Sequence, residues 1–346
     1  MSSPLIRVAV NGYGVIGKRV ADAITLQADM QLVGVADVAH DYRIASARRL
    51  GFDVFAGVPE ACAAMVEAGI DVQGGLDDLL ARADVIVDAT PKGVPATNLP
   101  AYRAAGVKVV VQGGEAHALT GHSFVAQANY ASARGRDATR VVSCNTTSVV
   151  RTLGALQDAG LLAGGRGVLM RRATDPWEAH LGGIMNTIVP ERQIPSHQGP
   201  DARTVRPELD VVTMAAKASH TQTHNHYWVV RLTRDATRDE VLDAFRAAPR
   251  IAFVRMDDGI VALNSTVELM KDLGRPRGDM WEVALWEDVL EVQGREAFYT
   301  YQVDNQAIVV PEVVDAIRAL ASDVDDATAS IDRTDAALGV RRDFVR

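Results

Sequence analysis

Up to about residue 143, short apolar runs alternate with stretches of helical composition. Runs of this length between polar turns predict buried strands, and the helices between them predict βαβ units. The predicted strands are Leu5–Val10, Gln31–Ala36, Val85–Ala89, Val107–Gln112 and Arg140–Ser143. The predicted helices are Lys18–Gln27, Pro59–Ala68, Leu76–Ala81 and Leu99–Ala105. This α/β alternation is typical of a doubly wound parallel sheet.

The pattern changes after residue 166, where longer strand-like runs dominate and predict an α+β domain with a mixed sheet. These runs are Gly167–Arg172, Val211–Lys217, Tyr227–Leu232, Trp281–Trp286 and Phe298–Val303, with a crossover helix at Arg238–Ala247. Residues 182–205 are rich in Gly and Pro and predict a long loop. The final helices are expected at Pro311–Leu320 and Ala327–Leu338. We therefore expect domains at 1–143 and 144–305, and C-terminal helices at 306–346.

Charge and cysteine content narrow the class of protein. The net charge is −8 without a long Lys/Arg run, which argues against nucleic acid as a partner. The two cysteines, Cys62 and Cys144, are too few for a disulfide framework and indicate a reducing compartment. The first residues lack a signal-peptide pattern, and no apolar stretch is long enough to cross a bilayer. A cytoplasmic protein without a membrane partner is expected.

The stretch NGYGVIG, residues 11–17, is a G-x-G-x-x-G between the first strand and a helix that starts near Val15. In a Rossmann-type domain, Gly12 permits the tight turn and Gly14 lets a pyrophosphate approach the backbone. Gly17 lets the helix pack closely on the strand, and the helix N-terminus attracts phosphates. The position directly after a strand favours dinucleotide binding over a purely structural turn.

Asp37 ends the second predicted strand, twenty residues after Gly17. A carboxylate there accepts hydrogen bonds from an adenosine ribose and repels a 2′-phosphate, which predicts NAD rather than NADP. Arg43, Arg48 and Arg49 follow and would weaken that preference. A merely solvated aspartate is the alternative.

Cys144 lies in VVSCNTTSVV, residues 141–150, between a strand and a helix that we expect to be capped by Thr146 and Thr147. A helix N-terminus lowers the pKa of a thiol, and backbone N–H groups of Asn145 and Thr146, with the Asn145 amide, would form an oxyanion hole. By position alone, an inert buried cysteine is an equal alternative. Cys62 lies in an alanine-rich stretch and is expected to pack a helix.

Arg171 and Arg172 end a strand, where paired guanidinium groups suit phosphate or carboxylate, or form ion pairs with nearby acids. His224 and His226 are two residues apart, so on a strand they face one side. One would serve as general base for a thiol. Companion metal ligands are missing from the sequence around them, so we predict no metal site. An ordinary pair of sheet histidines remains open.

Together these motifs resemble the type II, archaeal-type phosphorylating glyceraldehyde-3-phosphate dehydrogenases. The matching stretches are VNGYGVIGKRVADAI, VDATPKGVPATN, VQGGEAHAL, RVVSCNTTSVVRTL, RRATDP, IPSHQGPD, the histidine pair and DLGRPRGDMWEVALWED. The resemblance implies a homotetramer whose C-terminal helices return to the NAD(P)-binding domain. It implies oxidation of glyceraldehyde 3-phosphate, with NAD(P) and inorganic phosphate, to 1,3-bisphosphoglycerate through a thiohemiacetal and a thioester.

The resemblance also implies residue roles, with Cys144 as nucleophile and His224, slightly favoured, or His226 as base. The implied substrate and phosphate ligands are Ser143, Asn145, Thr146, Arg171, Arg172, His197 and Gln198. The implied cofactor contacts are Val15, Ile16, Gly113, Arg172 and Gln302, which join Gly12, Gly14, Gly17 and Asp37 from the glycine-rich turn and the second strand.

Two positions depart from the family pattern. Asp37-Val38 stands where Thr-Lys is common, which shifts the expectation towards NAD. His197-Gln198 replaces a histidine pair. The change removes a possible cation from the phosphate site and leaves the identity of the phosphorylated aldehyde open. A dehydrogenase of another phosphorylated aldehyde or semialdehyde (erythrose 4-phosphate, aspartate semialdehyde) is the alternative enzyme. A non-catalytic NAD-binding regulatory protein is the alternative outside enzymes.

Overall fold

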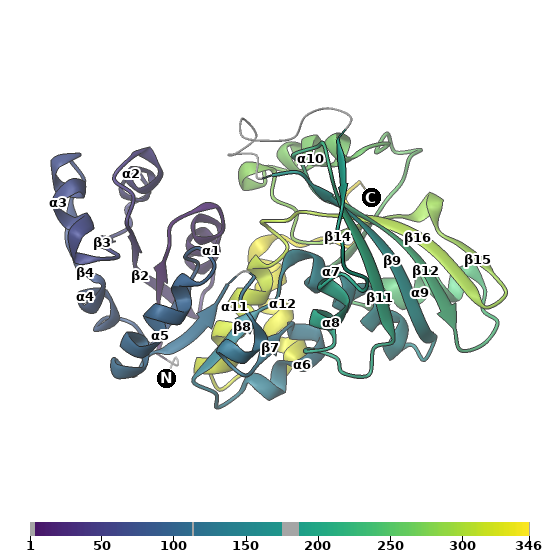
Figure 1. The fold of residues 1–346 in the computed structure, drawn as a ribbon, viewed down its shortest axis with the longest axis horizontal. Helices are drawn as coiled ribbons and strands as arrows, with labels where there is room; N and C mark the ends of the chain where they lie inside the picture. Colours follow the sequence, from purple (N-terminus) through teal and green to yellow (C-terminus); the bar gives the residue numbers. More distant parts are fainter. Residues whose placement is uncertain (1–3, 113, 175–186, 346) are drawn as a thin grey trace. The chain divides into compact units, whose positions relative to one another are not determined.

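The computed structural model describes residues 4–112, 114–174 and 187–345. The chain forms two compact units (Figure 1). The first unit contains the chain up to Val142 together with Val310–Gly339, and the second contains Ser143–Val309 and the residues from Val340 onward.

The first unit is built on a parallel sheet of eight strands in the order β4-β3-β2-β1-β5-β6-β8-β7. Its strands are β1 (Ile6–Asn11), β2 (Met30–Asp37), β3 (Val54–Ala56), β4 (Val72–Gly75), β5 (Val85–Asp88), β6 (Lys108–Val111), β7 (Ser123–Phe124) and β8 (Ala138–Val141). The expected doubly wound parallel sheet is confirmed. The sequence pattern missed β3 and β7, which have only three and two residues, and β4, whose sequence VQGG contains no apolar run.

Helices cover this sheet, and several begin where their first residues suit a helix start. They are α1 (Val15–Thr25), α2 (Tyr42–Arg49), α3 (Pro59–Glu67), α4 (Leu76–Leu80), α5 (Val94–Ala104), α6 (Ala126–Ala133), α11 (Val310–Ala321) and α12 (Ala327–Leu338). Pro59 occupies the first turn of α3, as expected, because its missing N–H costs nothing there. The pattern missed α2, which buries only Ile44 and Ala47, and placed the start of α5 five residues too late.

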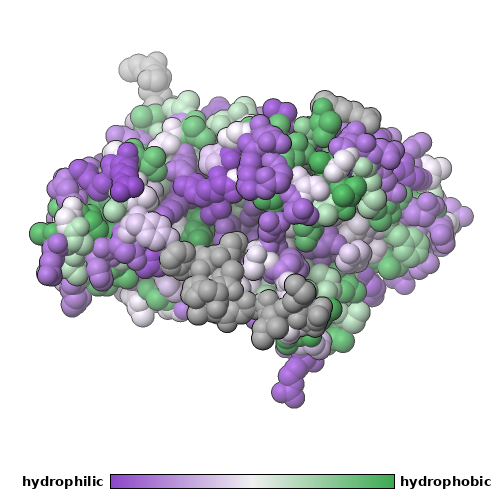
Figure 2. Space-filling view, turned by 90° about the horizontal axis from the view of Figure 1, so that it is seen from above, coloured by the Kyte–Doolittle hydropathy of each residue, from purple (hydrophilic) through white to green (hydrophobic). Residues whose placement is uncertain are grey.

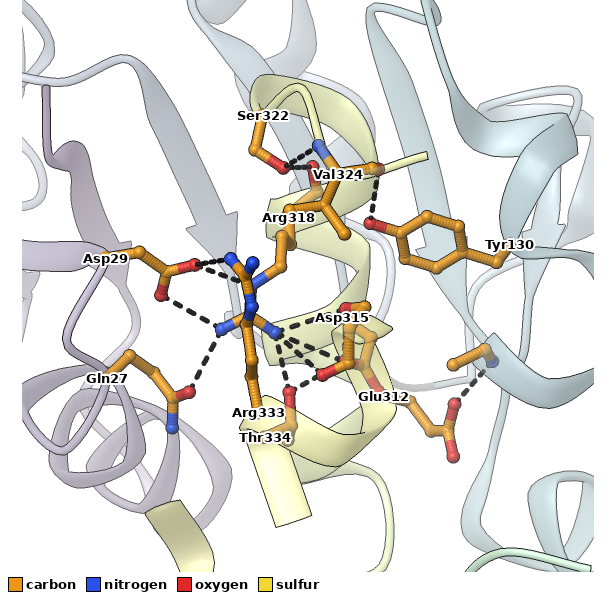
Figure 3. A network of polar contacts seen from close by, with 12 residues as sticks. Gln27, Asp29, Tyr130, Glu312, Asp315, Arg318, Ser322, Val324, Arg333 and Thr334 are labelled. Atoms are coloured by element: carbon orange, nitrogen blue, oxygen red, sulfur yellow. Dashed lines mark hydrogen bonds and ion pairs between the residues drawn. The ribbon is translucent and has the colours of Figure 1, made fainter. Parts of the chain in front are cut away.

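Helix α11 ties the end of the chain to the first unit through a buried polar network (Figure 3). The Arg318 guanidinium is fully buried and forms a two-pronged ion pair with Asp29, at 2.8 Å and 3.0 Å. It also donates to Thr334 of α12 and to Gln27. Asp315 accepts hydrogen bonds from the Ser330 and Thr334 hydroxyls at 2.7 Å and 2.6 Å. Each charge in this network therefore has several partners.

The second unit contains a mixed sheet in the order β10-β11-β9-β12-β16-β14-β13, with β15 paired to β16. Its strands are β9 (Leu162–Arg172), β10 (Ile188–Pro190), β11 (Val211–Ala218), β12 (His224–Leu232), β13 (Ile251–Val254), β14 (Val283–Trp286), β15 (Glu291–Gln293) and β16 (Glu296–Val303). The predicted mixed sheet is confirmed. The β12 strand extends further towards its N-terminus than expected and contains both His224 and His226.

One face of this sheet packs against helix α7 (Cys144–Asp158), which is buried from Asn145 to Leu156. The remaining helices are α8 (Gln198–Ala202), α9 (Arg238–Ala247) and α10 (Leu263–Asp272). The long loop expected at 182–205 is interrupted over its described part by β10 and α8, while residues 191–197 between them form no helix or strand. An exposed edge strand of three residues and a helix of five are too short for a sequence pattern to reveal.

Hydrophilic and hydrophobic side chains are interspersed over the face of the molecule shown in Figure 2. None of the helices in the described ranges has both the length and the apolar character needed to cross a membrane.

Candidate active site

The glycine-rich turn of the first unit lies between β1 and α1 and needs glycine at two of its three positions. Gly12 has a φ of +92°, and a Cβ there would lie 2.7 Å from the backbone of Ala89 and Thr90. A Cβ at Gly17 would lie 1.9 Å from the Gly12 carbonyl oxygen. At Gly14 a Cβ would meet nothing within 4 Å, so the backbone is open to an approaching group. The turn has the close packing and the open side that a bound pyrophosphate requires.

Asp37, at the end of β2, is held by three backbone N–H groups. Its Oδ2 atom accepts from Tyr13 at 2.6 Å, and its Oδ1 atom accepts from Val38 and Ala39 at 2.7 Å and 2.8 Å. The carboxylate therefore orders the glycine-rich turn through Tyr13, beyond the role in ribose binding that the sequence suggested. Since a carboxylate oxygen has two lone pairs, Oδ2 retains capacity for a ribose hydroxyl.

Two of the arginines that follow Asp37 have acidic partners. Arg43 forms a two-pronged ion pair with Asp41, and Arg48 pairs with Asp71 at 2.6 Å. Their charges are therefore partly neutralised near the end of β2.

Cys144 is the first residue of α7, and its side chain is partly exposed. The expected helix start at Thr146–Thr147 is wrong, because Ser143 is the N-cap and its Oγ accepts from the Thr146 N–H at 3.3 Å. The Thr146 N–H is therefore used in the helix cap. The Thr146 hydroxyl donates to Asp201 at 2.9 Å, and Thr146 is fully buried, so its side chain stabilises the start of α7.

Burial raises the pKa of the Cys144 thiol to about 11. The charge of Arg172, a hydrogen bond from the Asn145 N–H and the charge of Arg171 act in the opposite direction. Without a bound ligand the thiol is therefore protonated at neutral pH, in contrast to the lowered pKa that its helix position suggested. The same three groups are placed to favour a thiolate once it forms.

His226 is fully buried on β12 and holds the Asn145 side chain. Its Nε2 atom lies 2.8 Å from the Asn145 carbonyl oxygen Oδ1 and must donate, which leaves Nδ1 as an acceptor 3.0 Å from the Tyr301 hydroxyl oxygen and 3.5 Å from Ser148 Oγ. Burial lowers the pKa of His226 to about 3, with a further contribution from Arg171. His226 is thus a neutral side chain with both nitrogens occupied.

His224 lies on the same face of β12, with its ring nearly parallel to that of His226 and the ring centroids 6.5 Å apart. Its Nδ1 atom accepts from the backbone N–H of Arg172 at 3.0 Å, so the ring proton is on Nε2. Burial lowers the pKa of His224 well below its usual value, assisted by His226 and the two arginines. The prediction that the two histidines share a face is confirmed.

Arg171 and Arg172 end β9 and have different partners. Arg171 forms a short ion pair with Glu191, which follows β10, while Arg172 donates to the Thr174 carbonyl oxygen at 2.6 Å. The second oxygen of the Glu191 carboxylate lies 3.8 Å from Nδ1 of the exposed His197. No local sequence signal pointed to Glu191, which is twenty residues from its partner.

Two buried carboxamides in the second unit lack hydrogen-bond partners among the described residues. Gln198, the first residue of α8, is fully buried with both amide atoms unpaired. Gln302 on β16 has an unpaired Oε1 and only a long contact, 3.9 Å, from Nε2 to the Met280 sulfur. Register places Gln302 opposite Asn225, on the other face of the sheet from His224 and His226.

The remaining expected cofactor positions lie in the first unit. Val15 and Ile16 form the first turn of α1, and Val15 is exposed. Gly113 lies outside the described residues.

Comparisons with known proteins agree with this geometry. Residues 143–276 match the family described as glyceraldehyde 3-phosphate dehydrogenase, C-terminal domain. Residues 6–114 match the family described as dihydrodipicolinate reductase, N-terminus.

Curated relatives extend over nearly the whole chain, and three carry the name glyceraldehyde-3-phosphate dehydrogenase. The relative from Methanobrevibacter smithii is 42% identical over 96% of this chain and 99% of its own length. The relative from Pyrococcus abyssi is 43% identical over 97% and 99%, and that from Methanothermus fervidus is 39% identical over 96% and 98%. The chain therefore belongs to the archaeal-type glyceraldehyde-3-phosphate dehydrogenase family.

Proposed function

We propose that the protein oxidises glyceraldehyde 3-phosphate, with a nicotinamide cofactor and inorganic phosphate, to 1,3-bisphosphoglycerate. The observation that carries the proposal is the position of Cys144, which begins α7 under the influence of the Arg171 and Arg172 charges in a chain of this family. A thiol in this setting adds to an aldehyde and holds the acyl group that oxidation leaves behind.

Formation of the thiolate is the first chemical requirement. Because the pKa of the free Cys144 thiol is raised to about 11, the thiol must release its proton when the substrate binds. The start of α7, the Asn145 N–H and the Arg172 charge stabilise the resulting anion. The thiolate then attacks the aldehyde carbon, and the carbonyl oxygen becomes the thiohemiacetal alkoxide.

His224 suits the role of hydrogen-bond donor to that alkoxide. Its only lone pair, on Nδ1, is used by the Arg172 N–H, so Nε2–H is the group it offers. A role as base requires this hydrogen bond to break. We therefore favour His224 as the donor that polarises the aldehyde and stabilises the oxyanion, and His226 as the side chain that positions Asn145.

The first unit supplies the features that a dinucleotide needs. Gly12 and Gly17 are required by packing, Gly14 is open, and Asp37 retains capacity for a ribose hydroxyl. A nicotinamide cofactor held there would supply the hydride acceptor for oxidation of the thiohemiacetal to the thioester. The Asp37 carboxylate, and the pairing of Arg43 and Arg48 with acids, support a preference for NAD over NADP.

Inorganic phosphate completes the reaction by attacking the thioester carbon, which expels the Cys144 thiolate. Arg171 and Arg172 are the cations available for this phosphate and for that of the aldehyde. Over the cycle one proton is released: Cys144 loses a proton when it ionises and regains one after the thiolate is expelled, and the proton of the attacking hydrogen phosphate is lost. The free thiols of Cys62 and Cys144 fit a reducing compartment such as the cytoplasm.

An apolar surface of the second sheet supports the expected homotetramer. Val168, Met214, Tyr227 and Val229, on three neighbouring strands, are 36%, 46%, 52% and 41% exposed. Tyr227 and Met214 both pair with Val168, so the side chains are contiguous. Exposed apolar surface of this kind marks association sites, and we propose that further copies of the chain cover it.

An aldehyde panel with and without phosphate tests the proposed reaction. We expect NADH formation from glyceraldehyde 3-phosphate to require inorganic phosphate and to exceed that from erythrose 4-phosphate and aspartate semialdehyde. Phosphate-independent turnover would defeat the phosphorylating assignment. Iodoacetamide should abolish activity by modifying Cys144, whereas a regulatory NAD-binding protein would show no turnover to inhibit.

A further inference from the structure

Glu191 contacts two side chains that are expected to bind a phosphate group. One carboxylate oxygen accepts from Arg171, and the other lies 3.8 Å from His197 Nδ1. Its backbone is fixed, because the Glu191 N–H donates to the Ala215 carbonyl oxygen at 2.8 Å. The Arg171 and Glu191 side chains are 24% and 23% exposed, so the ion pair is only partly screened by water.

Near this ion pair, buried polar atoms lack hydrogen-bond partners among the described residues. Arg171 Nε is buried without a partner among the described residues, and so is the Gln198 amide, next to His197 in the chain. Unpaired buried donors are costly in a folded protein unless a ligand uses them. A phosphate group, with several acceptor oxygens and two negative charges, meets this need better than one carboxylate.

We propose that Glu191 is an internal anion that competes with a phosphate group for Arg171 and so sets the affinity for that phosphate. The inference rests on the proposed function and deepens it. In the ligand-free protein, Glu191 neutralises the guanidinium and holds it in place. When phosphate binds, Glu191 either leaves Arg171 or remains as a repulsive neighbour, and both outcomes weaken binding. The phosphate belongs either to the aldehyde or to the inorganic ion.

Steady-state kinetics of Glu191→Gln test the proposal and identify the phosphate. The substitution removes one negative charge a few ångströms from a phosphate dianion, in surroundings that water screens only partly. It should therefore lower the KM of the ligand whose phosphate Arg171 binds by about five- to tenfold. A fall in KM for glyceraldehyde 3-phosphate assigns Arg171 to the aldehyde, and a fall in KM for inorganic phosphate assigns it to the attacking ion. We expect kcat and KM for NAD to change less than about twofold.

Controls separate competition from a structural role. Glu208→Gln removes an exposed carboxylate of the same unit and should leave all constants unchanged. In an Arg171→Gln background the Glu191→Gln change should no longer lower either KM, because the contested cation is gone. If both phosphate KM values rise or stay constant in Glu191→Gln, or if Glu191→Ala and Glu191→Gln lose kcat alone, Glu191 is structural and the proposal is overturned. Absence of wild-type activity would instead refute the proposed function.

Discussion

Two regions, one in each unit, handle buried polar groups in opposite ways. Around Arg318 in the first unit, the buried guanidinium has several partners within 3.4 Å, and the network joins α11 and α12 to the segment before β2 that contains Gln27 and Asp29. Around Gln198 and Arg171 in the second unit, buried amide and guanidinium nitrogens have no partner among the described residues. A satisfied network stabilises a fold, whereas unpaired buried groups beside a candidate anion site remain available to a ligand or to water.

The most severe change to the second unit is the loss of its nucleophile. Cys144→Ser should reduce kcat by at least ~10³-fold, because a hydroxyl without a strong base is a poor nucleophile. The free energy of unfolding should stay within about 1 kcal/mol of wild type, since the side chains are similar in size. Progress curves and urea unfolding measure both effects. Cys62→Ser is the matched control, and residual activity of Cys144→Ser above a tenth of wild type would contradict the assignment.

The corresponding change in the first unit should affect stability instead. Arg318→Met leaves Asp29 and the buried Asp315 without their cation and should lower the free energy of unfolding by about 3–5 kcal/mol. Activity per folded molecule should be nearly unchanged. Arg333→Met is the control, because Arg333 is 56% exposed and 3.8 Å from Asp29, and we expect a loss below about 1 kcal/mol. Equal losses in the two variants would show that burial of Arg318 carries no special stability.

The preference for NAD or NADP tests whether Asp37, a polar group of the first unit, also contacts a ligand. Asp37→Asn should raise kcat/KM with NADP relative to NAD by about tenfold, since it removes the charge that repels a 2′-phosphate. The exposed Asp77→Asn variant should leave the ratio unchanged. A wild-type enzyme with equal or better kcat/KM for NADP would contradict the expected preference.

The smallest expected effect is that of replacing Gln198, and it tests directly whether an unpaired buried amide serves ligand binding or stability. Gln198→Met removes a buried amide without partners and should raise the free energy of unfolding by about 1 kcal/mol while it weakens substrate binding. Thermal unfolding and KM measurements report the two quantities. Gln293→Met, at an exposed position, should change neither. A destabilised Gln198→Met variant would mean that the amide is satisfied in solution and is not reserved for a ligand.

Sequence patterns predicted the elements whose signal is local. Strands β1, β2, β5 and β6 contain apolar runs between polar turns, and the glycine-rich turn is defined by spacing within seven residues. The exposed edge strand β10 has only three residues, and the contact between Arg171 and Glu191 depends on its pairing with β11 across a long stretch of sequence. The start of α7 was misplaced because either serine or threonine can cap a helix, and the backbone decides which one does.

The membership of α11 in the first unit has a consequence for synthesis on the ribosome. The first 142 residues emerge before Val310–Gly339, so the surface that receives α11 stays uncovered while Ser143–Val309 is made. During that time Asp29 also lacks the Arg318 guanidinium. The second unit is completed later still, because its final segment, which contains the buried Phe344, follows α12. Neither unit therefore has all of its contacts until the C-terminal part of the chain has been made.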